Sequence, residues 1–102
     1  MNAIAISDAR RFSLAEVQRR TLADLPGLAL ELVCFEAGQR LEVAAAERPS
    51  AYQVMEGEAL VRVGDEVARI GKGKVLPVPQ GTAHTLENAG GGLLVVLATH
   101  GG

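Results

Sequence analysis

The sequence predicts an all-β fold of the sandwich or barrel type, and three features of the 102-residue chain support this. From Leu28 onward, apolar and polar residues alternate with a period of two in short runs. Glycine or proline separates most of these runs, as expected for tight turns between strands. Only one segment, near the N-terminus, has helical spacing. Many short strands at close intervals are typical of β-sandwiches and β-barrels.

The N-terminal segment, residues 1–27, is predicted to be a strand or helix region distinct from the barrel. Ser13 and Glu16 have the spacing of a capping box, in which side-chain oxygens accept hydrogen bonds from the first backbone N–H groups of a helix. Apolar residues then recur at helical spacing. We therefore expect a short N-terminal helix over Ser13–Arg20, followed by a turn at Pro26-Gly27.

The barrel is predicted over residues 28–100, and the whole chain is expected to form a single domain. Its strand-like runs are LALELVCFE, RLEVAAA, AYQVMEG, ALVRV, VARI, VLPVP, AHTLEN and LLVVLAT. The clearest hairpin is VRVGDEVARI, with its tip expected over Gly64 to Glu66. Pro77 and Pro79 lack the N–H that an inner strand needs, so their strand is expected at a sheet edge.

Composition narrows the class of partner. The net charge is −2 and aromatic residues make up only 3% of the chain, so a basic, stacking surface for nucleic acid is not expected. No apolar run reaches membrane-spanning length, and charged residues interrupt the start of the chain before a signal peptide could form. A single cysteine fits a reducing compartment. The expectation is a soluble, cytoplasmic protein with neither nucleic acid nor membrane as its partner.

The segment GKVLPVPQGTAHTLEN carries five residues at a distinctive spacing: Gly73, Pro79, Gly81, His84 and Asn88. The pattern G-x5-P-x-G-x2-H-x3-N resembles the second motif of the cupin superfamily, with every position filled. Pro79 and Gly81 favour a tight turn, since proline restricts φ and glycine accepts a positive φ, and His84 then enters the next strand. The resemblance implies a small cupin-type jelly-roll β-barrel.

The first cupin motif, G-x5-H-x-H-x3/4-E-x6-G, retains its terminal glycines but lacks its metal ligands. Gly38 and Gly57 stand at its two ends. The histidine positions hold Ala44 and Ala46, and the glutamate position holds Ser50. The family site binds a divalent metal through three imidazoles and one carboxylate, whereas alanine has no donor atom and a neutral hydroxyl is a weak ligand. We therefore expect neither a metal ion nor another cofactor.

The resemblance instead points to a small-molecule pocket in the barrel. Alanine in place of two histidines enlarges such a cavity and makes it more apolar, which suits a small, largely apolar ligand. Strand alternation places Ser50 and Tyr52 on one face, and it places Glu42 inside the barrel if Ala44 points there. The predicted ligand-binding residues are His84, Ser50, Tyr52, Ala44, Ala46 and Glu42.

Several of these side chains have a second interpretation. Tyr52 is either a pocket group or, the favoured alternative, a half-buried strand residue whose hydroxyl reaches solvent. Glu42 could form a makeshift metal site with His84 and Cys34, but we favour Glu42 in water near the barrel mouth and Cys34 as a small core residue. His100, beside the terminal glycines, is expected to be exposed and mobile. Asn88 is expected to form a turn.

The sequence therefore predicts a metal-less cupin-fold protein that binds or senses a small molecule. The alternative is a metal-independent isomerase or lyase-like enzyme with His84 as general base, because the charge of imidazole changes near neutral pH. No partner for His84 can be named from the sequence, so catalysis is left open. A metal-dependent dioxygenase or isomerase is disfavoured by the missing ligands. A homodimer is expected, because small cupins commonly pair and open sheet edges need cover; the N-terminal segment is the candidate contact.

Overall fold

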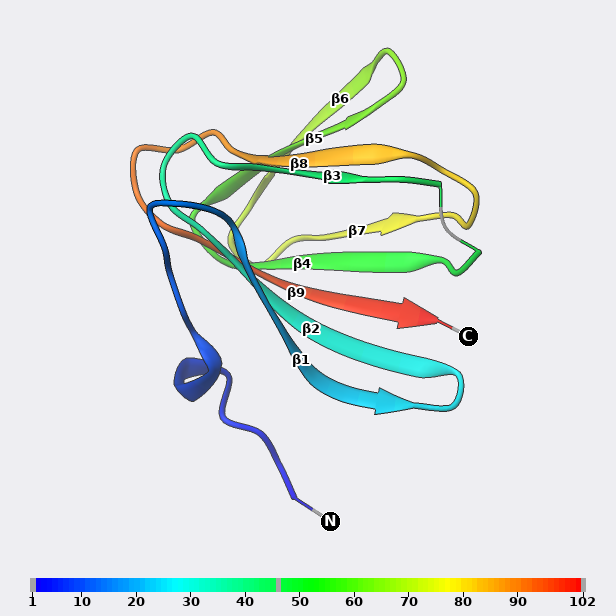
Figure 1. Cartoon of the computed structure of the whole chain (residues 1–102). Coiled ribbons are helices and arrows are strands. Elements are labelled where there is room, and N and C mark those ends of the chain that lie inside the picture. Colours follow the sequence, from blue (N-terminus) through cyan, green and yellow to red (C-terminus); the bar gives the residue numbers. More distant parts are fainter. Residues whose placement is uncertain (1, 46, 102) are drawn as a thin grey trace.

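The protein is described by a computed structural model that covers residues 2–45 and 47–101 (Figure 1). Within these residues, nine strands form two sheets that face each other. The strands are β1 (Gln18–Leu25), β2 (Leu28–Phe35), β3 (Arg40–Val43), β4 (Ser50–Glu56), β5 (Glu58–Val63), β6 (Glu66–Gly71), β7 (Val75–Val78), β8 (His84–Asn88) and β9 (Leu94–Gly101). A single 3-10 turn, η1 (Ile6–Ala9), precedes them. Among the described residues, no helix is long and apolar enough to cross a bilayer.

Both sheets are antiparallel, and their strand order brings distant parts of the chain together. The five-stranded sheet has the order β1-β2-β9-β4-β7, and the four-stranded sheet has the order β3-β8-β5-β6. The C-terminal strand β9 therefore lies in the middle of the larger sheet, between β2 and β4 (Figure 1). This two-layer arrangement confirms the predicted all-β jelly-roll class.

The strand predictions from Leu28 onward are confirmed, because each predicted run overlaps one of the strands β2 to β9. The proline-containing strand β7 is an edge strand of the five-stranded sheet, as expected from its missing N–H groups. The predicted β5–β6 hairpin also forms. Its tip is shorter than expected, since Val63 pairs with Glu66 and only Gly64 and Asp65 lie in the turn.

The helix predicted over Ser13–Arg20 is wrong. The Ser13 hydroxyl accepts a hydrogen bond from the backbone N–H of Ala15 (3.1 Å), which closes a small turn instead of capping a helix. From Gln18 the chain enters β1, which pairs with β2 from Leu28 to Cys34. An isolated short helix is marginal in water, whereas the free edge of β2 offers a full ladder of backbone partners. The Pro26-Gly27 turn is present and joins β1 to β2.

The apolar residues form two cores, one on each face of the five-stranded sheet. The core between the sheets contains Val33, Phe35, Tyr52, Val54, Ala59, Val61, Ile70, Val78, Leu86, Leu94, Val96 and Ala98. The core on the other face contains Ala9, Leu32, Cys34 and Val95, and residues of the N-terminal segment pack against it. Strand β2 contributes side chains to both cores, so both of its faces are apolar and its sequence shows little alternation between apolar and polar residues.

Cys34 belongs to the outer of these two cores. Its side chain is 2% exposed, and burial raises the pKa of the thiol. This confirms the interpretation of Cys34 as a small core residue. A site shared with His84 is excluded, because Cys34 and the inward-facing residues of β2 lie on opposite faces of the sheet.

Two motif residues have structural roles in this fold. Gly57 joins β4 to β5 at φ 86°, and a Cβ atom there would clash with the carbonyl oxygen of Leu93. Asn88 is 3% exposed and organises the loop after β8: its amide donates to the carbonyl of Gly92 (2.8 Å), and its carbonyl accepts from the N–H of Gly90 (3.1 Å). The turn-forming role expected for Asn88 is confirmed.

Candidate functional site

A row of polar side chains crosses the barrel wall at one end of the molecule. This is the end at which β3 and β9 finish and β4 and β8 begin, on the right in Figure 1. The row runs from His84 through Tyr52, Ser50 and His100 to Glu31. These five residues come from four strands, so only the folded sheets bring them together.

Strand alternation explains why the row faces inward. On β4, Tyr52 and Val54 belong to the core between the sheets, and Ser50 shares their face. On β9 the same face carries Ala98 and His100. The register sets Ser50 opposite His100 and Tyr52 opposite Ala98. The small side chain of Ala98 fits this arrangement, in which the rings of Tyr52 and His100 approach edge to face with centroids 6.4 Å apart.

His84 is buried and has a definite partner. Its side chain is 6% exposed, with Nδ1 2.8 Å from the Thr82 carbonyl oxygen and Nε2 2.6 Å from the Tyr52 hydroxyl. A carbonyl can only accept, so Nδ1 carries a hydrogen. In the neutral imidazole, Nε2 therefore accepts a hydrogen bond from the Tyr52 hydroxyl. The partner that the sequence could not name is Tyr52.

The favoured interpretation of Tyr52, a hydroxyl that reaches solvent, is wrong. Tyr52 is 2% exposed and lies in the core between the sheets. Burial raises the pKa of its hydroxyl, and the nearby Ser50 hydroxyl offsets part of this increase. The reason is that the inner face of β4 packs in one core with residues of the four-stranded sheet, such as Val61 and Leu86.

His100 is neither exposed nor free, contrary to expectation. Its side chain is 17% exposed, with Nδ1 2.6 Å from the Ser50 hydroxyl and Nε2 3.5 Å from a carboxylate oxygen of Glu31. Strand β9 extends to Gly101 and pairs on both sides, which holds His100 in the wall. The same oxygen of Glu31 accepts hydrogen bonds from two nitrogens of Arg19, at 2.7 and 3.2 Å.

A hollow of about 300 Å³ opens beside this row at the barrel mouth. It is lined by Arg19, Thr21, Asp24, Ala29, Leu30, Glu31, Val43, Arg48, Ser50 and His100. Arg19 is paired with Glu31, whereas Arg48 has no ion-pair partner among the residues described. His84 and Tyr52 do not belong to this lining; on β4, Tyr52 follows Ser50 by two residues and lies in the core between the sheets.

Two predicted site residues lie on the other side of the wall. Leu41 and Val43 pack against the core, so Glu42 between them points outward; its side chain is 73% exposed and pairs with Arg40. Ala44 follows the end of β3 and is exposed. The inward placement considered for Ala44, and conditionally for Glu42, is not observed, because the alternation on β3 has the opposite phase. The favoured interpretation of Glu42, a side chain in water, agrees with its exposure. Ala46, the remaining position, lies outside the described residues.

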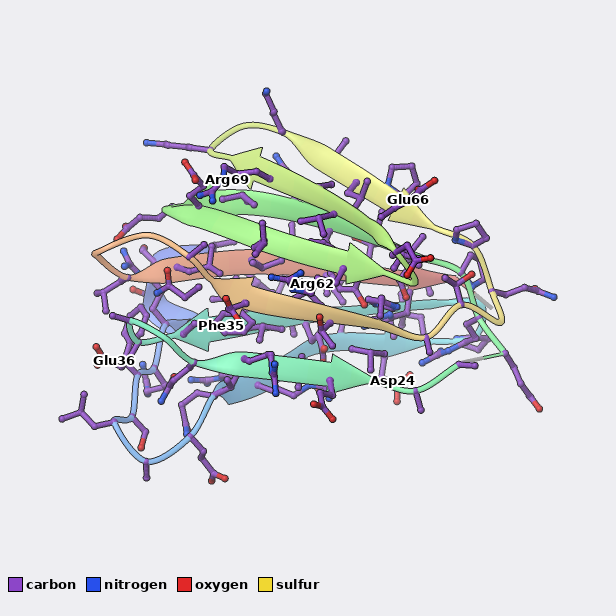
Figure 2. All side chains as sticks on the ribbon, turned by 90° about the horizontal axis from the view of Figure 1, so that it is seen from above. Asp24, Phe35, Glu36, Arg62, Glu66 and Arg69 are labelled. Atoms are coloured by element: carbon purple, nitrogen blue, oxygen red, sulfur yellow. The ribbon has the colours of Figure 1, made fainter. Side chains whose placement is uncertain are left out.

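Glu42 and Ala44 instead border a second, more open hollow of about 580 Å³, which also reaches His84. Arg40, Arg62 and Thr85 belong to its lining. Figure 2 looks down on the four-stranded sheet and shows charged side chains on β5 and β6, among them Arg62 and Arg69. The site residues proposed from sequence are therefore divided between two hollows.

Glu31, Arg19, Arg48 and His100 are site residues that the sequence interpretation missed. Glu31 had a recognisable signal, because it is the one charged residue within the apolar run LALELVCF. Arg19 was hidden by the expected helix, since only a strand at β1 brings it beside Glu31. His100 was discounted for its place near the chain end.

The residues at the family's metal-binding positions do not fit a metal ion. Ala44 offers no donor atom, and the hydroxyl of Ser50 is bonded to His100. Both ring nitrogens of His84 are engaged, by Thr82 and Tyr52. In the part of the chain that the structure covers, no group of three or more His, Cys, Asp or Glu side chains could hold such an ion.

Comparison with known proteins supports the same fold. The profile of the Cupin domain family matches residues 31–100. The TT1209 protein of Thermus thermophilus is similar in structure, with a TM-score of 0.91 and 20% identity over 99% of this chain and 97% of that one. An RmlC-like cupin from Desulfovibrio desulfuricans has a TM-score of 0.86 and 25% identity over 99% and 96% of the two chains. No curated protein sequence matches the chain.

Proposed function

Because the chain belongs to the cupin family, we propose that it binds a small molecule in the hollow at the barrel mouth, without a metal ion. The observation that carries this proposal is a set of polar side chains, Ser50, His100 and Arg48, that line a cavity of about 300 Å³. Pockets for small molecules are of this size and combine apolar walls with a few placed polar groups.

The lining favours a ligand with an apolar body and one anionic group. Ala29, Leu30 and Val43 supply apolar surface, and Arg48 supplies a cation that no acidic side chain neutralises among the residues described. The ligand proposed here is therefore still largely apolar, as expected from the sequence, but it also carries an anionic group at one end. Guanidinium groups bind carboxylates well because their N–H groups match both oxygens.

Asp24 makes one side of the hollow acidic, so a bound anionic ligand is expected to have a preferred orientation. Across the sheet, Ser50, His100, Ala29 and Asp24 occupy successive strands β4, β9, β2 and β1. Three strand spacings separate the two ends of this line, a distance of about 14 Å. Arg48 precedes Ser50 by two residues, so the anionic group of the ligand is expected near β4 rather than near Asp24.

Benzoate, benzyl alcohol and benzylamine provide a matched set of probes for this proposal. We expect benzoate to shift the amide NMR signals of Ser50, His100 and Ala29 more strongly than the neutral or cationic probe. Arg48→Ala should weaken benzoate binding about fivefold, the effect of losing ~1 kcal/mol. Arg20→Ala is the control, because Arg20 is exposed and absent from this lining. Equal responses to all three probes, or binding unchanged by Arg48→Ala, would contradict the proposal.

A metal-independent isomerase or lyase-like reaction is the second candidate function. The observation that favours it is the buried His84–Tyr52 pair, which gives the candidate base a defined tautomer and a proton-carrying neighbour. Once a bound compound is identified, His84→Ala distinguishes the two functions. Loss of turnover with binding retained would support the enzyme, and a compound that is bound but never transformed would support the binding protein.

Two other expectations remain parts of the proposal. We propose a homodimer, and β1 and β6 are suited to the contact because each is an unpaired edge in the structure of residues 2–45 and 47–101. Light scattering that gives the mass of one chain would overturn it. A cytoplasmic location is also proposed, and fractionation of the host cell tests it.

A further inference from the structure

A further hollow, of about 220 Å³, opens in the side of the barrel between the edge strands β6 and β7. This β6–β7 hollow reaches Val61 and Val78 of the core between the sheets, and Val63, Ala68 and Leu76 of its wall pack against the same core. Among the described residues, it shares no lining residue with the hollow at the barrel mouth. It is therefore a separate and mainly aliphatic cavity.

Two prolines on the rim prevent another strand from closing this hollow along β7. In the described sheets β7 pairs only with β4, and β6 only with β5, so no ladder joins the two edges. A proline inside a paired strand directs its missing N–H to the free edge, and Pro77 has this position opposite Ala51. Pro79, just beyond the strand, lacks a second donor. An occupant of the hollow is thus bound by side chains and not as an extra strand on β7.

Glu66, at the start of β6, gives the β6–β7 hollow its charge. It pairs in register with Val63 and, by strand alternation, shares the inner face of β6 with Ala68 and Ile70. Its carboxylate has no ion-pair partner among the residues described. In Figure 2, Glu66 lies toward β7, whereas Arg62 lies toward the middle of the four-stranded sheet.

The neighbouring cations belong to other surroundings. Arg62 is opposite Val67 in the register and lines the more open hollow that reaches His84. Arg69 is paired with Glu58. Glu66 is therefore the only charged side chain that the described residues contribute to this lining, and the cavity is apolar inside and negative at its rim.

We propose that the β6–β7 hollow binds a small organic amine, with its apolar body against the aliphatic wall and its ammonium group at Glu66. An apolar cavity of about 150 Å³ accommodates benzene. The 220 Å³ present here therefore has room for one six-membered ring. The hydroxyl of Thr82, which also lines the hollow, offers an acceptor for a further N–H of the ammonium group.

The proposal goes beyond the binding function at the barrel mouth and does not depend on it. The mouth contains the unpaired cation Arg48 and favours an anionic group, whereas the β6–β7 hollow contains the unpaired carboxylate Glu66 and favours a cationic one, both among the residues described. The two cavities are therefore expected to select ligands of opposite charge.

The three probes chosen for the barrel mouth test this inference on the same full chain, through a different set of signals. Benzylamine should shift the amide NMR signals of Val67, Ala68 and Thr82 more strongly than benzyl alcohol, and benzoate should shift them least. This order is the reverse of the one expected at the mouth. Arg48→Ala should leave the benzylamine response at these signals unchanged, so either proposal can fail while the other holds.

Glu66→Gln removes the negative charge with little change of shape. It should weaken benzylamine binding about threefold, the effect of losing one solvent-accessible ion pair, and leave benzyl alcohol binding unchanged. Asp65→Asn is the matched control, because Asp65 is the neighbouring exposed carboxylate of the hairpin tip and is absent from the lining. Benzylamine binding should be the same in this control as in the unmodified protein.

Three results would overturn the proposal. Equal responses to the amine and the alcohol, or benzylamine binding unaffected by Glu66→Gln, would show that Glu66 selects no cation. An equal loss in Asp65→Asn would show only a general attraction to the acidic hairpin tip. Signals of Val67, Ala68 and Thr82 that move on dilution without any probe, and do not respond to benzylamine, would show that a second copy of the chain covers the hollow.

Discussion

The two ends of the barrel use the same strands for opposite purposes. At one end, the inner face of β2 and β9 carries Phe35 and Leu94, each fully buried. At the other end, the same faces of the same strands carry Glu31 and His100, and Figure 2 places Asp24 at this end, opposite Phe35. Because the two purposes are separated along each strand, one end supplies stability and the other is free to carry polar groups.

The difference also shows how buried polar groups are accommodated. Within the closed end, Asn88 satisfies backbone groups of the loop, a purely structural use. Within the open end, each polar side chain of the row bonds at least one other member of the row, and the row ends in an ion pair near water. Unpaired polar groups are costly in a low-dielectric interior, so this wall holds its polar side chains as hydrogen-bonded partners.

The largest effect that separates the two ends is expected from Phe35→Ala. Phe35 is 0% exposed in the core between the sheets, so truncation leaves a cavity and should lower the free energy of unfolding by about 3–5 kcal/mol. Ser50→Ala at the open end removes a hydrogen bond only and should cost about 1 kcal/mol. Urea unfolding of both variants measures the difference, and equal losses would refute the division between the ends.

A smaller effect is expected from neutralising the carboxylate that ends the row. Glu31→Gln weakens the contacts with Arg19 and His100 and should cost about 1 kcal/mol. Glu42→Gln is the matched control, because Glu42 is 73% exposed on the outer face and its loss should change stability by less than about 0.5 kcal/mol. Thermal unfolding at low ionic strength tests the pair. A larger loss for Glu42→Gln would mean that the inner and outer faces have been misassigned.

The smallest effect is expected in the alkaline range. Burial raises the pKa of Tyr52 above its ordinary value of 10.0, so folding favours the neutral hydroxyl. Its contribution is fully present below that value and is lost as the pH rises through the higher pKa of the folded state. Tyr52→Phe cannot ionise and should lack this part of the alkaline loss of stability. Denaturant midpoints measured across this range in both proteins provide the test, and parallel curves would contradict it.

Local sequence patterns determined most of the strands and turns. Alternation and turn residues located β2 to β9, because period-two burial and backbone sterics act over a few residues. The spaced motif around Gly81, which has φ 76°, located the turn that delivers His84 to β8. The missing donor at Ala44 was equally visible, since the identity of a side chain needs no structure.

Only the tertiary structure decided what required two distant segments. Residues 18–25 became a strand because the edge of β2 was available, and this brought Arg19 to Glu31. The pairing of His84 with Tyr52 and of Ser50 with His100 depends on the order and register of three strands, β4, β8 and β9. Glu42 points outward because of the phase in which β3 meets the core. Strand order, register and phase are long-range quantities, and a local pattern in the chain does not contain them.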